Sequence, residues 1–174
     1  VVARTKLVVG DPSYFSDRVA TRGKVVRAIA LLDHPLPGTT ESDSCQVIMP
    51  AAQVGRYSDL YLFCCSNTHK VAPQGRYVAC LSTNVQSDCE GMTAQQVAEK
   101  ELAAGLQLLH PCHRIFYDLT DMMVPKGDGR SDQVFISESF DPTSHFETAI
   151  NDVLAIYSRI TGAPLVLTDG AVSY

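Results

Sequence analysis

The stretch that decides the fold is residues 58–85, which reads SDLYLFCCSNTHKVAPQGRYVACLSTNV. Two apolar runs, residues 60–65 and 77–81, flank a polar and turn-rich connection at residues 66–75. A strand that is wet on one face alternates apolar and polar residues, because successive side chains point to opposite faces. Neither run alternates, so we predict two adjacent antiparallel strands, buried on both faces, at the centre of a sheet. Each large side chain buried there contributes about 1.5–3 kcal/mol to folding.

The composition favours one ordinary globular domain. A chain of 174 residues is long enough to bury a proper core. Its net charge of −5 gives no electrostatic footprint for binding nucleic acid. No apolar run approaches the roughly 20 residues of a membrane span, and no signal-peptide pattern opens the chain. The first residue is Val1 rather than Met and lies almost inside a predicted strand, so we expect a piece of a longer protein.

The six cysteines do not fit a disulfide framework. Cys64 and Cys65 are adjacent within one apolar run, and Cys80 lies within the other. Neighbouring strand residues face opposite sides, so a bridge between Cys64 and Cys65 would be strained. We therefore expect buried, reduced thiols and a cytoplasmic protein.

Further apolar runs and turn residues place the remaining sheet elements. Strands are predicted at residues 6–9, 25–32, 45–49, 115–124 and 133–137. Residues 125–129, PKGDG, fit a turn that joins the last two strands as a hairpin. Short helical turns are expected at residues 14–20 and 51–56. The predicted fold class is α/β in the mixed α+β sense, a largely antiparallel or mixed sheet with flanking helices.

The first convincing helix spans residues 93–109. Its apolar residues recur at three- and four-residue steps: Ala94, Ala98, Leu102, Leu106 and Leu109. Thr93 and Gln96 have the spacing of a capping box. Gly105 inside a helix costs about 1 kcal/mol relative to alanine. We therefore expect the helix to approach a neighbour closely at Gly105.

A second helix is predicted over residues 144–160. Its apolar stripe comprises Phe146, Ile150, Val153, Tyr157 and Ile160, widened by Ala149, Leu154 and Ile156. Ser144 and Glu147 fit a second capping box, and Gly162 with Pro164 fits a helix stop. A stripe this wide needs more cover than one sheet face supplies. Residues 163–174 are expected to form a C-terminal tail after a domain part at residues 1–162.

Two groups of residues have side chains suited to chemistry, and each has a plainer interpretation. His110, Cys112 and His113 could ligate a metal, but a tetrahedral site needs about four ligands and no second cluster matches. A helix–strand junction is the favoured interpretation. Cys64 could pair with a distant histidine as a nucleophile. An apolar strand is a poor place for a reactive thiolate, which favours a core cysteine.

Polar residues near the second helix and on the predicted hairpin are also candidates. Asp141, His145 and Glu147 bracket a helix N-terminus, where an anion could bind. Roles as a cap partner and as surface residues fit them better. Asp118 and Asp121 lack a partner base and are expected to face solvent.

The turn at residues 125–129 is not a phosphate-binding loop. It has neither the Gly-Lys-Ser/Thr of a P-loop nor a GxGxxG pattern. No set of residues assembles an active site, so we predict no catalytic residue, no cofactor-binding residue, no metal ligand and no enzyme activity.

Short motifs along most of residues 2–162 resemble the Rab GDP dissociation inhibitors. They are Asp11-Pro-Ser-Tyr14, Asp17-Arg-Val19, Ser44-Cys-Gln46, Gln53-Val54, Arg56 with Ser58-Asp59, Ala72 with Gln74-Gly75 and Tyr77, Val124-Pro-Lys126, Phe135-Ile-Ser137 and His145-Phe-Glu-Thr148. Residues 86–96 and the stretch after Gly162 match the family pattern poorly. Rab escort proteins share the architecture but are less similar around residues 44–46 and 145–148.

The resemblance implies an adaptor without catalysis and without a flavin or other cofactor. Such a protein binds GDP-bound, prenylated Rab GTPases, inhibits GDP release, and recycles the GTPases between membranes and the cytoplasm, with transient membrane association. The family fold is similar to flavin monooxygenases, and this chain resembles the C-terminal part that contains the substrate-domain-like sheet. The second helix would then pack on the N-terminal part of the same domain. The family's Rab and prenyl contacts would lie upstream of Val1, so the resemblance assigns no partner-binding residue here and implies a fragment inactive alone.

Three alternatives remain open at this point. The chain could belong to a Rab escort protein, or to a related flavin-dependent oxidoreductase, which would show flavin absorbance. It could also be a stand-alone scaffold domain.

Overall fold

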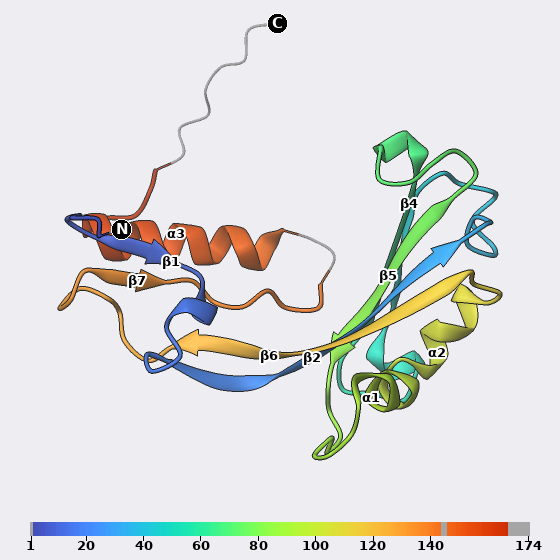
Figure 1. Ribbon diagram of the computed structural model, residues 1–174, viewed down its shortest axis with the longest axis horizontal. Coiled ribbons are helices and arrows are strands. Elements are labelled where there is room, and N and C mark those ends of the chain that lie inside the picture. The colour runs from blue at the N-terminus through green and yellow to red at the C-terminus, as the bar shows by residue number, and fades with distance from the viewer. Residues whose placement is uncertain (1, 144–145, 167–174) are drawn as a thin grey trace, which may run out of the picture. The chain divides into compact units, whose positions relative to one another are not determined.

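A computed structural model describes residues 2–143 and 146–166 (Figure 1). The chain forms two compact units. One comprises Arg22–Met122 with Asp141–His145, and the other comprises Val1–Thr21, Met123–Phe140 and Phe146–Tyr174. We call them the sheet unit and the terminal unit.

The sheet unit is built on a five-stranded sheet in the order β3-β4-β5-β2-β6. The strands are β2 (Val19–Leu32), β3 (Cys45–Met49), β4 (Leu60–Ser66), β5 (Tyr77–Asn84) and β6 (Arg114–Pro125). β4 and β5 are adjacent and antiparallel, with Leu62 opposite Leu81. The prediction of an adjacent antiparallel pair is confirmed, and β5 is the middle strand.

The two faces of this sheet differ in cover. Leu60, Leu62 and Leu81 point to one face and are fully buried in the main apolar core. On the other face, Phe63 is 40% exposed and Ile29 is 37% exposed. The prediction that both faces are buried is therefore wrong at Phe63, but it holds at Cys65, which lies on the same face and is 8% exposed. Residues 60–65 show no alternation of apolar and polar residues, because the exposed position in this run is also apolar.

Helices cover the buried face (Figure 1). The predicted helix at residues 93–109 is divided into α1 (Ala94–Glu101), α2 (Ala103–Leu106) and the 3-10 turn η4 (Gln107–Leu109). The Thr93–Gln96 capping box is confirmed: Gln96 N–H donates to Thr93 Oγ1 at 3.3 Å, and Thr93 N–H donates to Gln96 Oε1 at 2.9 Å. α1 ends at Leu102, whose φ of −108° and ψ of 9° leave the helical region.

Gly105 brings α2 against the sheet. A Cβ atom at this position would lie 2.5 Å from Leu81 Cδ1 and 2.7 Å from Cδ2. Leu81 is fully buried in the core, so it has little room to move away. The expected close approach at Gly105 is confirmed, and its partner is the middle strand.

The terminal unit contains a two-stranded parallel sheet. β1 (Val8–Gly10) pairs with β7 (Val134–Ile136), with Val9 opposite Phe135. The predicted hairpin between β6 and β7 is wrong, because β7 pairs with β1 instead. Residues 126–133 redirect the chain through Gly129, which has a positive φ and where a Cβ atom would lie 2.4 Å from Val134 O. A turn signal in sequence marks a change of direction but does not identify the strand that pairs next.

The segment between β1 and β2 also differs from the sequence expectation. Asp11 caps the 3-10 turn η1 (Pro12–Tyr14) by accepting from Ser13 N–H at 2.9 Å. The helical turn predicted at residues 14–20 lies earlier, at Pro12–Tyr14, and β2 already begins at Val19. The turn expected at residues 51–56 is present as η2 (Ala51–Gln53).

The last helix, α3 (Glu147–Thr161), packs on β7 and buries Ile156. Its C-terminus is Gly162 with a φ of 78°, as predicted. Phe146 occupies the N-cap of α3 without a side-chain bond, and Ser144 lies outside the described residues, so the Ser144–Glu147 capping box stays a prediction. Four apolar side chains along one face are exposed: Phe146, Ile150, Val153 and Tyr157. We call these four residues the α3 stripe.

Substitution Gly105→Ala should destabilise the chain. The added methyl must displace the buried Leu81 side chain, at a cost of about 1–3 kcal/mol, partly offset by the roughly 1 kcal/mol higher helix propensity of alanine. We expect a net loss of about 1 kcal/mol in the free energy of unfolding, measured in urea. Gly127→Ala is the matched control, because a Cβ atom there meets nothing within 4 Å. Equal stability of both variants and the parent chain would contradict the close-contact interpretation.

Candidate functional site

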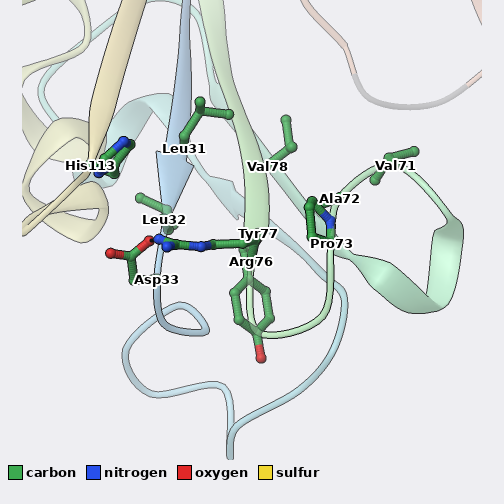
Figure 2. Close-up of a pocket in the computed structure, with 10 residues that line it drawn as sticks. All are labelled: Leu31, Leu32, Asp33, Val71, Ala72, Pro73, Arg76, Tyr77, Val78 and His113. Atoms are coloured by element: carbon green, nitrogen blue, oxygen red, sulfur yellow. Dashed lines mark ion pairs between the residues drawn. The ribbon is translucent and has the colours of Figure 1, made fainter.

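An apolar pocket of 330 Å³ lies within the sheet unit, at one end of β2 and β5 (Figure 2). It is lined by ten residues: Leu31, Leu32, Asp33, Val71, Ala72, Pro73, Arg76, Tyr77, Val78 and His113. Its floor comes from strand ends and its wall from the connection between β4 and β5. This volume is at the lower end of the roughly 300–1,000 Å³ range of small-molecule sites.

The register of β2 and β5 determines which side chains form the pocket floor. Leu31 lies opposite Val78, and Leu32 lies opposite Tyr77. Opposite residues in an antiparallel pair point to the same face, so Leu31 and Val78 form one apolar surface. This surface belongs to the less covered face of the sheet.

The wall follows from local chain geometry. Ser66 Oγ accepts from Thr68 N–H at 3.4 Å and starts the 3-10 turn η3 (Asn67–His69). Lys70 then takes a left-handed conformation with a φ of 58°. The reversal places Val71 and Pro73 beside the end of β5.

The two charged residues of the lining are paired with each other. Arg76 forms an ion pair with Asp33, and Figure 2 shows its side chain extending to that carboxylate. The backbone N–H of His113 donates to Leu31 O at 2.8 Å. The lining offers no cysteine, serine or threonine as a nucleophile. The pocket is therefore suited to accept an apolar group rather than to perform chemistry.

The predicted metal candidates do not form a metal site. His110 Nδ1 lies 3.8 Å from Cys112 Sγ, a hydrogen-bonding distance, while His113 lines the pocket. Within residues 2–143 and 146–166, no group of three His, Cys, Asp or Glu side chains could hold a metal ion. These contacts favour the junction interpretation.

Cys64 has the properties of a core residue. Its side chain is buried, and burial, followed by the neighbouring Cys45 and Cys65, raises its pKa to about 12. At neutral pH it is a protonated thiol, which is a weak nucleophile.

The acidic candidates are paired with other groups. Asp118 lies 3.9 Å from Arg27, and Asp121 forms an ion pair with Lys24. Asp118 is exposed, as expected, whereas Asp121 is only partly exposed. Asp141 Oδ1 accepts from Thr143 N–H at 3.0 Å and from its hydroxyl at 2.6 Å.

Glu147 is exposed in the first turn of α3. His145 lies outside the described residues, so the favoured interpretation of these residues as a cap partner and surface residues stays a prediction. No helix in the described ranges is long and apolar enough to cross a membrane.

Sequence reasoning missed a buried ion pair between Arg56 and Glu101. Arg56 NH1 lies 2.6 Å from Glu101 Oε2, and the side chains are 9% and 1% exposed. Arg56 also donates to Asn84 O at 3.0 Å, and Ser87 N–H donates to Glu101 Oε1 at 3.0 Å. These bonds tie the segment after η2 to the end of β5 and to α1. The feature of the sequence that could have indicated this ion pair is Glu101 itself, a glutamate within the apolar face of a helix.

The charge of Glu101 is stabilised by its partners. Burial acts to raise the pKa of its carboxyl group, but hydrogen bonds from Ser87 and Arg56 outweigh burial and lower the pKa below 4.5. Glu101 is therefore ionised at neutral pH, as the ion pair requires.

Comparison with known proteins gives one consistent result. A family model described as GDP dissociation inhibitor matches residues 1–171. Guanosine nucleotide diphosphate dissociation inhibitor 1 of Arabidopsis thaliana is 44% identical over 166 residues, covering 95% of this chain and 36% of that protein. Rab GDP dissociation inhibitor beta of Canis lupus familiaris is 43% identical over 162 residues, covering 93% and 35%.

A solved structure is similar along the same residues. The crystal structure of a Rab GDI from Plasmodium falciparum superimposes with a TM-score of 0.83 at 34% identity, covering 92% of this chain and 35% of that one. The predicted mixed α/β class with a mostly antiparallel sheet agrees with this architecture. The chain spans about a third of the length of these relatives.

Substitution Glu101→Gln should leave the buried Arg56 charge uncompensated. We expect a loss on the order of 3 kcal/mol in the free energy of unfolding at pH 7, measured in urea. Because the folded-state pKa of Glu101 is below 4.5, its contribution is complete above about pH 4.5 and is lost as pH falls through that folded-state pKa. The stability difference between the variant and the parent chain should therefore shrink in acid.

The control is Glu99→Gln on the same helix, where the glutamate is exposed and accepts from Gln95. Its effect should stay within about 0.5 kcal/mol. A Glu101→Gln effect as small as the control, or one independent of pH, would contradict the role of this pair.

Proposed function

The chain belongs to the GDP dissociation inhibitor family, and we propose that it is the C-terminal part of a Rab GDP dissociation inhibitor. The whole protein binds GDP-bound, prenylated Rab GTPases, inhibits GDP release and recycles the GTPases between membranes and the cytoplasm. The observation that carries this proposal is the agreement of sequence and fold over the same residues, with 34% identity and a TM-score of 0.83 across 92% of the chain.

Proteins of this family are regulators rather than enzymes. In this proposal the chain forms part of the domain structure and supplies no catalytic residue. Residues 1–162 form part of the family's multisheet domain, and residues 163–174 form the tail after it. The paired rim charges and the scattered acidic residues of the sheet unit support a structural role.

The prenyl-binding site lies outside this chain in our proposal. Transfer of a prenyl group from water gains about 0.8 kcal/mol for each buried CH₂, so tight binding requires a deep apolar cavity. The sheet-unit pocket is small for a long isoprenoid, and its mouth carries the Arg76–Asp33 ion pair. The buried side chains of α1 and α2 pack in the core of the sheet unit.

The α3 stripe supports a contact with the rest of the protein. Four large apolar side chains on one helix face are exposed, which is unusual for a surface that stays in water. The relatives have about two thirds of their length outside the matched region. We propose that the N-terminal part of the same protein covers this stripe.

The proposal predicts that this chain alone does not extract prenylated, GDP-bound Rab from membranes. The measurement compares Rab released from membranes by this chain and by the longer protein that contains it. A matched variant of the longer protein is Val71→Asp, which places a charge at the exposed pocket wall.

We expect extraction by the longer protein and by its Val71→Asp variant, and only background release by this chain. Equal extraction by this chain would show that the binding surface lies within it. Loss of extraction in the Val71→Asp variant, with unchanged folding, would place the prenyl group in the pocket.

A further inference from the structure

Two cysteines face one another across the edge of the five-stranded sheet. β3 is the edge strand, and its first residue, Cys45, lies directly opposite Cys64 of β4. Opposite residues of an antiparallel pair have Cα atoms about 4.5 or 5.5 Å apart, depending on the hydrogen-bonding site. Disulfide-bonded cysteines span about 4.4–6.8 Å between Cα atoms. A bond between Cys45 and Cys64 therefore fits the existing strand register.

The two thiols also share one face of the sheet. Directly opposite side chains point to the same side. Cys64 belongs to the buried core, and Cys45 packs against the margin of that core while remaining partly exposed. Cys45 is therefore the more accessible residue of the two.

From this arrangement we propose that Cys45 and Cys64 form a reversible cross-strand disulfide when the chain meets a disulfide oxidant such as glutathione disulfide. The Cys45 thiolate attacks one sulfur of glutathione disulfide, breaks its S–S bond and releases one glutathione thiolate. Cys64 then loses its proton to solvent and attacks the Cys45 sulfur, which releases the second glutathione. Two protein thiols are oxidised, and one glutathione disulfide is reduced to two glutathione molecules.

The other cysteines lack this arrangement. Cys65 follows Cys64 on β4 and therefore points to the opposite face, where its strand partner is Val78. Cys80 lies opposite Phe63. Cys65 thus provides a control thiol one residue away, on the other side of the same strand.

The resting state is reduced, and the second step is slow. All six cysteines carry free thiols in the structure. Burial raises the pKa of both Cys45 and Cys64, and hydrogen bonding with Thr39 partly opposes the change at Cys45. The first attack is therefore faster at Cys45, and both steps accelerate as pH rises. The finished bond fastens the edge strand β3 to β4 at one end.

The test maps disulfides in the folded chain. The chain is incubated with excess glutathione disulfide at pH 8, free thiols are alkylated, and the protein is digested with trypsin without reduction. Cleavage after Arg27, Arg56 and Lys70 leaves Cys45 as the single cysteine of peptide 28–56, and Cys64 with Cys65 in peptide 57–70. We expect a cross-linked pair of these peptides that disappears after dithiothreitol treatment.

Two variants and the fragmentation spectrum of the cross-linked peptides show which cysteines form the bond. Cys64→Ala should reduce the cross-linked pair at least tenfold, whereas Cys65→Ala should retain it. Fragmentation of the cross-linked peptides from the parent chain assigns the bond to Cys64 or Cys65 directly, so the answer does not depend on whether a variant folds. A bond at Cys65, a bond to Cys80, or glutathione adducts at Cys45 without a cross-link would overturn the proposal.

Discussion

The contact between Gly105 and Leu81 sets the geometry of the sheet unit. Without a side chain at Gly105, the backbone of α2 lies directly against the Leu81 side chain of the middle strand, close enough that a Cβ atom would collide with it. This approach brings Leu102, Leu106 and Leu109 into the same core as the buried face of β4 and β5. One face of the sheet is thereby used for packing. The other face receives the residue 141–142 segment, through a bond from Ser82 Oγ to Pro142 O at 2.6 Å, and carries the pocket floor.

Local sequence signals predicted local structure well. The capping box at Thr93, the glycine of α2 and the adjacency of β4 and β5 each depend on residues that lie near one another in sequence. The family was also recognisable, because short motifs recur in order along most of the chain. The face of β4 that contains Phe63 was misjudged, because periodicity reports polarity and not exposure.

Features that depend on distant residues were not predictable in the same way. The pairing of β1 with β7 joins segments that are far apart in sequence, and the Arg56–Glu101 ion pair joins the segment after a turn to a helix. The pocket combines two strand ends with a connection that looked merely polar and turn-rich. In each case the sequence provides the participating residues, but only the folded backbone determines which of them meet. The α3 stripe was visible in sequence, whereas its exposure was not.

We propose that this chain is one part of a larger inhibitor, in which other residues cover the α3 stripe. The most direct measurement is amide hydrogen exchange of α3, residues 147–161, in this chain alone and in the longer protein that contains it. Exchange reports local opening, so a helix covered by additional packing should exchange more slowly. We expect slower exchange of α3 in the longer protein and unchanged exchange in β4 and β5. Identical exchange of α3 in both proteins would contradict the claim.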